Sequence, residues 1–327
     1  MLVPPTGPPT MLVGPESVED ALLAGQICTV RVLREFTHPD EDYPYSTVRS
    51  LAETVGSAAS RRRIGLAGRT LSRDDLMAAF RQTLPHFEWL DVENAMCELH
   101  AVRTPAERAV IGRAYQIAEA GLHAALETVR PGVTERSIAA EIDAAMRRMG
   151  SEGTGIDTIV ASGENTRPIL ARSTFRTVQS NDLVLLTIAP RYEGYHAAIG
   201  RPALVGTEDR QIRAAVEVAG EAQEAYCALM RPGIQGLEVE VAGRRIVEHA
   251  GLGKFFPYSG VHSVCVIEFE PPIFGPKSAA VLSTNMVISV DIPLFNTPWA
   301  GLRIEDGFLI TDTGAMRLNT TPPLIQK

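Results

Sequence analysis

The chain has 327 residues, 45% of them hydrophobic and 21% charged, with a formal net charge of -8 at pH 7. This length allows two domains, because single hydrophobic cores stop growing at about 250 to 300 residues. The negative charge argues against nucleic acid or an anionic membrane as the main partner, since both attract basic surfaces. The four cysteines form no Cys-X-X-Cys pair, so a zinc or redox motif of that kind has no support.

The first residues are rich in proline and lack the basic start and continuous apolar run of a signal peptide. No run of about 18 apolar residues occurs elsewhere, so we expect a cytoplasmic protein. We predict a disordered lead over residues 1–13. Residues 14–103 are predicted to form a small α/β domain, with a helix that begins after Ser17 and a buried strand over 63–68.

A second domain is predicted over residues 104–327. Thr104 is a typical helix N-cap, Pro105 suits the first helical position, and Glu107 places an acidic side chain in the first turn. Apolar residues follow at helical spacing, so a long helix opens this domain.

The most informative feature is an internal repeat with an offset of about 101 residues. The corner Arg130-Pro131-Gly132 recurs as Arg231-Pro232-Gly233, between an alanine-rich helix and an amphipathic one. Each copy then leads into strand-like sequence, at 156–160 and 183–188 in the first, and at 264–269 and 286–290 in the second. We interpret this as two related α+β halves; the alternative is coincidence between two common helix-turn-helix pieces.

Four segments resemble one known superfamily, namely Ser162-Gly163-Glu164-Asn165, Asn181 to Leu186, Gly194-Tyr195 and Arg303-Ile304-Glu305-Asp306. They are similar to segments of creatinase, prolidase, aminopeptidase P and methionine aminopeptidase, over roughly residues 105 to 320. The resemblance implies the α+β pita-bread fold with its pseudo-twofold repeat. It also implies a homodimer.

In the peptidases of that superfamily, two aspartates, a histidine and two glutamates hold two metal ions. By resemblance, the aspartates fall at Thr187 and Ala198, which cannot replace them. The histidine is kept as His262, one glutamate is shortened to Asp291, and the other is kept as Glu305. We therefore expect no dinuclear centre and assign no metal ligand or cofactor, and a single ion at His262, Asp291 and Glu305 is the alternative.

Creatinase is the metal-free member of this superfamily. Its catalytic histidine would fall at or beside Leu170, so this chain lacks it. One of its two substrate-gripping glutamates falls at Gly200, whereas the other is retained as Glu305. Creatine is therefore not the expected substrate.

The candidate catalytic residues are those able to move or orient a proton, namely His262, Glu305, Asp291 and His196. The candidate substrate-binding residues are Arg303, Glu268, Glu270, Tyr258, Arg201, Thr187 and Phe269. Strand alternation predicts that Arg303 and Glu305 share one face, and likewise Glu268 and Glu270. The alternative for each of these residues is a purely structural role, such as forming an ion pair or filling space in the core.

The leading hypothesis is a metal-independent, creatinase-like hydrolase or lyase. It would act by acid/base chemistry on a small polar molecule, either derived from an amino acid or amidine-like. The alternatives are a catalytically inactive binding module and a mononuclear metallohydrolase. No nucleic acid or membrane partner is expected.

Overall fold

The computed structural model describes residues 1–25, 27–32, 55, 63–68, 72, 74–206 and 209–327. Backbone contacts divide the chain into two compact units, Met1–Met96 and Cys97–Lys327. The sequence-based boundary, at residues 103 and 104, falls just after helix α4 (Glu93–Ala101).

The N-terminal unit is built from short elements. Its other elements are β1 (Thr10–Val13), η1 (Pro15–Ser17), α1 (Val18–Ala24), β2 (Thr29–Val32), β3 (Arg63–Leu66), α3 (Asp74–Thr83) and β4 (Glu88–Asp91). Strands β1 and β2 pair in parallel, as do β3 and β4. Thus the last four residues of the lead that was expected to be disordered form a strand, because they find a hydrogen-bonding partner in β2.

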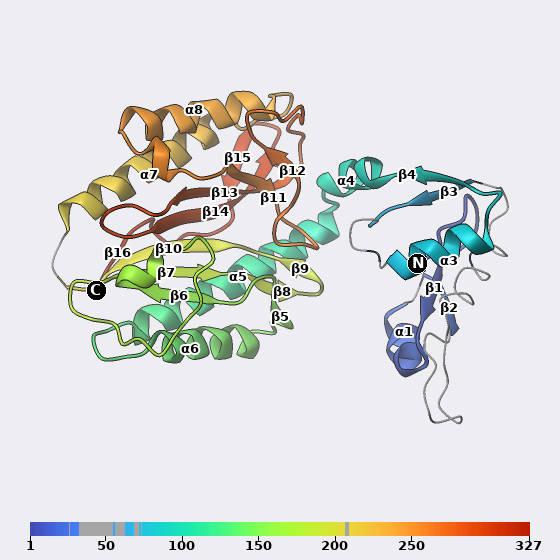
Figure 1. The fold of residues 1–327 in the computed structure, drawn as a ribbon, viewed down its shortest axis with the longest axis horizontal. Helices are drawn as coiled ribbons and strands as arrows, with labels where there is room; N and C mark the ends of the chain where they lie inside the picture. The colour runs from blue at the N-terminus through green and yellow to red at the C-terminus, as the bar shows by residue number, and fades with distance from the viewer. Residues whose placement is uncertain (26, 33–54, 56–62, 69–71, 73, 207–208) are drawn as a thin grey trace. The chain divides into compact units, whose positions relative to one another are not determined.

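The C-terminal unit holds a nine-stranded sheet and four long helices (Figure 1). The helices are α5 (Pro105–Thr128), α6 (Glu135–Arg148), α7 (Arg210–Leu229) and α8 (Gly236–His249). The main sheet contains β6 (Ile159–Ser162), β7 (Leu183–Ile188), β10 (Ile199–Leu204), β11 (Gly260–Ser263), β12 (Glu270–Phe274), β13 (Val287–Leu294), β14 (Leu302–Thr311), β15 (Gly314–Arg317) and β16 (Ile325–Gln326). A small sheet contains β5 (Gly153–Thr154), β8 (Pro190–Tyr192) and β9 (Tyr195–His196), and two short 3-10 helices are η3 (Gly163–Thr166) and η4 (Gly253–Phe255).

The order of the central strands is β12-β11-β13-β14-β10-β7-β6, so the two halves of the chain meet where β14 pairs with β10. Helices α5 and α6 pack on the first half, whereas α7 and α8 pack on the second. Helix α5 begins as expected, since Thr104 and Glu107 form a capping box around Pro105.

The predicted repeat is confirmed by matching backbone geometry at its corners. Gly132 and Gly233 have φ angles of 86° and 87°. The N–H of Gly132 donates to the carbonyl of Val178, and that of Gly233 to the carbonyl of Leu282, both at 2.9 Å. Glycine suits both corners because side chains strain this backbone region.

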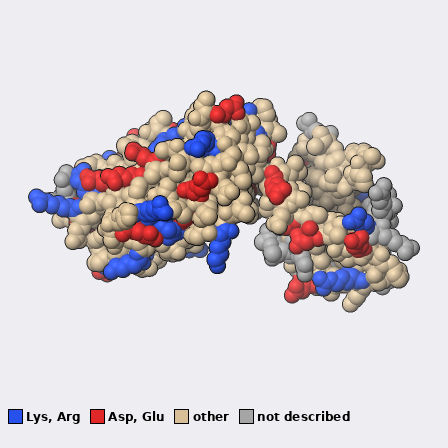
Figure 2. All heavy atoms as spheres, turned by 90° about the horizontal axis from the view of Figure 1, so that it is seen from above, with Lys and Arg blue, Asp and Glu red and all other residues tan. Residues whose placement is uncertain are grey.

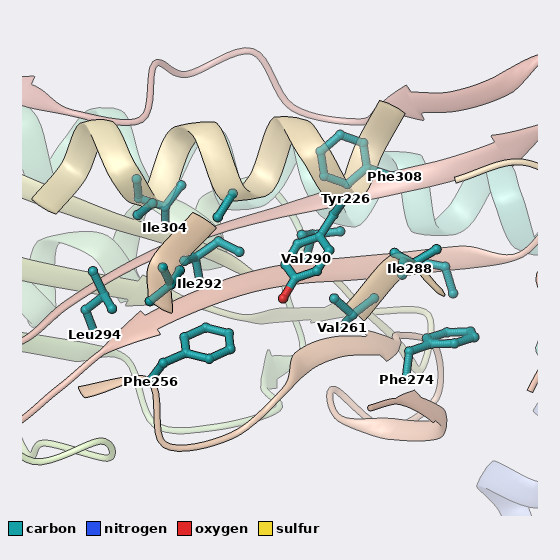
Figure 3. Close-up of a cluster of buried hydrophobic side chains, with 14 of the residues drawn as sticks. Tyr226, Phe256, Val261, Phe274, Ile288, Val290, Ile292, Leu294, Ile304 and Phe308 are labelled. Carbon is teal, nitrogen blue, oxygen red and sulfur yellow. The ribbon is translucent and has the colours of Figure 1, made fainter. Parts of the chain in front are cut away.

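The core of the second half lies between α7, α8 and the sheet. Figure 3 shows Tyr226 of α7 and Phe274 of β12 among aliphatic residues of β13, such as Val290 and Ile292. These side chains are almost completely buried. This packing fixes the strands of the second half, which also carry the polar residues of the candidate site.

One expected strand is absent. Residues 264–269 form a loop, because the pairing of β11 with β12 shifts register after His262. The carbonyl of Cys265 in this loop accepts from the N–H of His196 at 2.7 Å. As a result, side chains of the loop do not alternate as they would in a strand.

The described surface has no dominant basic region on the face shown in Figure 2, where acidic and basic side chains are interspersed. Among the described residues, no helix is long and apolar enough to cross a membrane.

Candidate active site

A row of paired residues crosses the sheet where the two halves meet. Thr187 pairs with Gly200, Gly200 with Glu305, Glu305 with Asp291, and Asp291 with Gly260. Neighbouring strands lie about 4.8 Å apart, so residues far apart in the sequence come to one level of the sheet. The site is therefore formed by both repeats.

A cavity of about 340 Å³ opens beside this row. Its lining consists of Ile156, Ile169, Leu170, Tyr258, His262, Glu268, Phe269, Asp291, Arg303 and Glu305. The aliphatic residues come from the first half, and all of the ionisable ones from the second. One part of the wall is thus apolar, and another part carries three carboxyl groups.

His262 lies in this cavity with 1% of its surface exposed. Its Nδ1 is 2.9 Å from the carbonyl of Ser263, which can only accept, so Nδ1 carries the proton. Its Nε2 lies 3.7 Å from Oε1 of Glu305. Burial works against the charged imidazole, but the Glu305 carboxylate outweighs burial and raises the pKa of His262.

The three carboxyl groups differ in their partners. Glu305 accepts from the hydroxyl of Ser289 at 2.8 Å, and contacts with His262 and Arg303 overcome burial and lower its pKa. Burial, together with repulsion from Glu305, raises the pKa of Glu268 to about 7. Burial likewise raises the pKa of Asp291 to about 6. Negative charge is therefore in excess in this cavity.

Arg303 supplies the cation that faces these acids. Its Nε lies 3.1 Å from Oδ2 of Asp291, and its Nη2 donates to the hydroxyl of Tyr258 at 2.6 Å. The same hydroxyl donates to Oδ2 of Asp291 at 2.7 Å, and Nη1 of Arg303 reaches Oγ1 of Thr187 at 3.4 Å. Asp291 and Arg303 thus form one network with Tyr258 and Thr187.

The structure brings seven of the eleven candidate residues to the cavity, namely His262, Glu305, Asp291, Arg303, Glu268, Tyr258 and Phe269. The expected sharing of a face by Arg303 and Glu305 is met, since both lie in β14 and line the cavity. The ring of Phe269 lies over that of His262, with centroids 4.0 Å apart.

The other four candidates lie outside the lining. Thr187 is buried and reaches the cavity only through Arg303. Arg201 is completely buried, pairs with Asp306 and donates to the carbonyl of Glu305 at 2.8 Å, so it holds strand β14 and is not placed to contact a substrate.

Glu270 and His196 are also engaged elsewhere. Glu270 forms a buried ion pair with Arg103 at 2.8 Å, and it does not share a face with Glu268, because Glu268 lies in the 264–269 loop whereas Glu270 begins β12. His196 is buried, with Nδ1 3.1 Å from the carbonyl of Cys265, and burial lowers its pKa.

Sequence reasoning missed the apolar wall of the cavity. Ile156, Ile169 and Leu170 carry no chemistry of their own, so no motif marked them. The available signal was Leu170, a large apolar residue in a polar loop, and 65% of its surface is exposed. Its side chain lines the cavity, so a bound ligand would cover it.

Three side chains offer potential metal ligands close together. One donor atom from each of His262, Glu268 and Glu305 lies within 4.8 Å of the other two. This set differs from the alternative raised by the sequence, in which Asp291 stood in the place of Glu268. Asp291 is instead turned to Arg303 and Tyr258.

Comparisons with known proteins agree on one family. Residues 109–312 match the model of metallopeptidase family M24. The Xaa-Pro dipeptidase of Pyrococcus furiosus is 30% identical over 258 residues, which span 79% of this chain and 74% of that protein. The crystal structure of the prolidase from Pyrococcus horikoshii superposes with a TM-score of 0.85 at 25% identity, over 96% of this chain and 85% of that one.

The fold agrees equally with the X-Pro aminopeptidase of Thermotoga maritima, with a TM-score of 0.86 at 23% identity, over 97% of this chain and 85% of that one. These superpositions confirm the pita-bread fold. The sequence relatives and the family match contradict the functional hypothesis, since the relatives are named as Xaa-Pro dipeptidases and the family is one of metallopeptidases, not of metal-independent, creatinase-like enzymes. The sequence-based interpretation took the loss of two aspartates at Thr187 and Ala198 to favour metal-independent chemistry, and it kept a single bound ion only as an alternative. With the family model matching more than half of its length, this chain belongs to metallopeptidase family M24.

Proposed function

We propose that this protein is a metal-dependent hydrolase that cleaves short peptides of the Xaa-Pro type. The observation that carries the proposal is the cavity, which is lined by His262, Asp291 and Glu305 together with apolar residues of the first half. Ligand pockets usually measure about 300 to 1,000 Å³, so about 340 Å³ suits a small substrate such as a dipeptide. The names of the relatives support the same substrate class.

The side chains present do not fit two metal ions. Thr187 offers only a hydroxyl, which already contacts Arg303, and Ala198 offers no donor atom. The cavity still holds three carboxyl groups beside one guanidinium, which is an acid-rich lining that favours a bound divalent cation. The Oδ1 atom of Asp291 is buried without a hydrogen-bond partner, and such an atom is costly unless a cation or its bound water meets it.

One divalent ion therefore fits this site. When bound, such an ion polarises a carbonyl group and makes water a better nucleophile near neutral pH. The ligands themselves are held by neighbours, because Ser263 fixes the ring of His262 and Ser289 holds Glu305. Such outer contacts keep donor atoms oriented for binding.

The remaining residues orient the substrate and exclude water. Phe269 covers the ring of His262, and Leu170 and Ile169 supply apolar surface at the same cavity. A proline ring or another apolar side chain would bury its surface there, at about 25 cal/mol for each Å² removed from water. Tyr258 and Arg303 hold Asp291 in place at the cavity.

The test uses the purified full-length chain and a panel of Xaa-Pro dipeptides, with matched Xaa-Ala dipeptides for comparison. We expect cleavage of Xaa-Pro dipeptides with Mn²⁺, Co²⁺ or Zn²⁺, loss of cleavage after treatment with a chelator, and loss of cleavage in His262→Ala. Circular dichroism of the variant checks that it is folded. Full cleavage after removal of metal would overturn the proposal, and so would failure to cleave any of the dipeptides with all three ions.

A further inference from the structure

Glu268 is an acid at the cavity for which the family pattern gives no role. It lies in the 264–269 loop, where a strand was expected, and the loop turns its side chain to the cavity instead of towards Arg103. Within the described part of the chain its carboxylate makes no hydrogen bond, although the residue is half-buried. A carboxylate in such a position lacks the partners that usually compensate its burial.

His262 presents a lone pair towards the same space. Its Nδ1–H is used by the Ser263 carbonyl, so the neutral ring has its free electron pair on Nε2, which faces Glu305. A lone pair beside carboxylate oxygens is unfavourable unless a proton or a metal ion lies between them. His262 is almost completely buried, so bulk water does not provide this compensation, and a proton on Nε2 does so until a metal ion replaces it.

The distances suit a metal ion. The donor atoms of His262, Glu268 and Glu305 all lie within 4.8 Å of one another. An ion between them would need small side-chain movements to bring each donor atom to a ligand distance of roughly 2.0 to 2.2 Å. One imidazole nitrogen and two carboxylate oxygens form a donor set that suits borderline and hard divalent ions such as Zn²⁺ and Mn²⁺.

Asp291 is held away from this set. Its Oδ2 is engaged by Tyr258 and Arg303, and the guanidinium repels a cation at that side of the carboxylate. Its unpartnered Oδ1 still adds negative potential to the cavity and can accept from a metal-bound water.

We propose that Glu268, together with His262 and Glu305, forms a single-ion site for a divalent metal, in which Glu268 takes over from the carboxylates lost at Thr187 and Ala198. The proposal rests on the metal dependence proposed above, but it concerns which residues bind the ion. The assignment can therefore be tested by measuring metal binding, without a substrate.

The experiment is isothermal titration of the chelator-treated, full-length protein with Mn²⁺ and with Zn²⁺. We expect one ion per chain, and Glu268→Gln should weaken binding at least about 10-fold, since even outer contacts of metal ligands are worth about 10- to 100-fold in affinity. Glu164→Gln removes one negative charge from an exposed residue of η3 and serves as the matched control, with unchanged affinity.

Binding of two ions, absence of binding, or equal affinity in Glu268→Gln and the wild type would overturn this assignment. The two proposals fail separately. If one ion binds through Glu268 but no dipeptide is cleaved, the proposed function is wrong and the metal site stands. If dipeptides are cleaved with metal while Glu268→Gln binds and cleaves normally, the function stands and the ligand assignment is wrong.

Discussion

The guanidinium of Arg303 lies 3.1 Å from the carboxylate of Asp291 on the neighbouring strand, and both side chains are almost completely buried. The attraction to Asp291 overcomes the effect of burial and raises the pKa of Arg303 further. Asp291, which stands in place of one family glutamate, is thus already paired with a cation of the chain itself.

Breaking this ion pair should destabilise the fold strongly. Arg303→Met leaves Asp291 as an uncompensated buried acid, and removal of one partner of a buried pair costs about 3 to 5 kcal/mol. Urea denaturation of Arg303→Met and of the double variant Arg303→Met/Asp291→Asn measures this cost. The double variant should be more stable than Arg303→Met. If it is equally stable or less stable, the two charges are not coupled.

Gly200 should be required beside Arg303. A Cβ atom on Gly200 would lie 2.6 Å from Cγ of Arg303 and 3.0 Å from Cβ of Glu305. We expect Gly200→Ala to displace Arg303 and to lower the free energy of unfolding by about 1 to 3 kcal/mol. The control is Gly220→Ala in helix α7, where nothing lies within 4 Å and alanine should stabilise the helix by about 0.5 to 1 kcal/mol. Equal stability of the two variants would contradict the contact.

Glu135 should make the stability of the first half depend on acid pH. Its buried carboxylate accepts from the N–H and hydroxyl groups of Ser162 and Thr174 and from the amide of Asn165. Burial opposes ionisation, but these hydrogen bonds outweigh it and lower the pKa of Glu135 below its ordinary value of 4.5.

Because the folded pKa lies below the unfolded one, the stabilisation is complete above pH 4.5 and is lost as the pH falls through the folded pKa. Glu135→Gln should cost about 1 to 3 kcal/mol at neutral pH. The measurement is urea denaturation of both proteins between pH 3 and pH 7, and the difference between them should shrink at the acid end. A difference that stays constant with pH would exclude this contribution.

Leu170 should affect substrate binding and not the fold. Since 65% of its surface is exposed and it lines the cavity, Leu170→Ser should raise KM for Xaa-Pro dipeptides by roughly 10-fold, equivalent to about 1.4 kcal/mol, at unchanged stability. Phe175→Ser is the control, because Phe175 is 74% exposed and does not line the cavity. A similar KM in both variants would remove Leu170 from the substrate site.

The repeat and the helix caps could be predicted from the sequence because they depend on local chemistry. Gly132 and Gly233 mark corners that need a positive φ angle, and Thr104 with Glu107 caps a helix within four residues. The assignment of His262, Asp291 and Glu305 to the site came from the resemblance to the superfamily, and the structure places each of them in a strand of the main sheet.

The metal-binding role proposed for Glu268 could not be predicted in the same way, although the sequence placed this residue among the substrate-binding candidates. It depends on a register shift after His262 that turns residues 264–269 into a loop, and on a contact between His196 and Cys265 that no local pattern reveals. Likewise, Arg201 and Glu270 were assigned to the substrate, although their partners Asp306 and Arg103 lie far from them in the sequence.

The most direct test of the account is titration of the chelator-treated enzyme with Mn²⁺ while cleavage of an Xaa-Pro dipeptide is followed. The account predicts no cleavage without metal, a rise in proportion to added ion, and a plateau at one ion per chain. Cleavage that persists without metal, or a plateau only at two ions per chain, would contradict it.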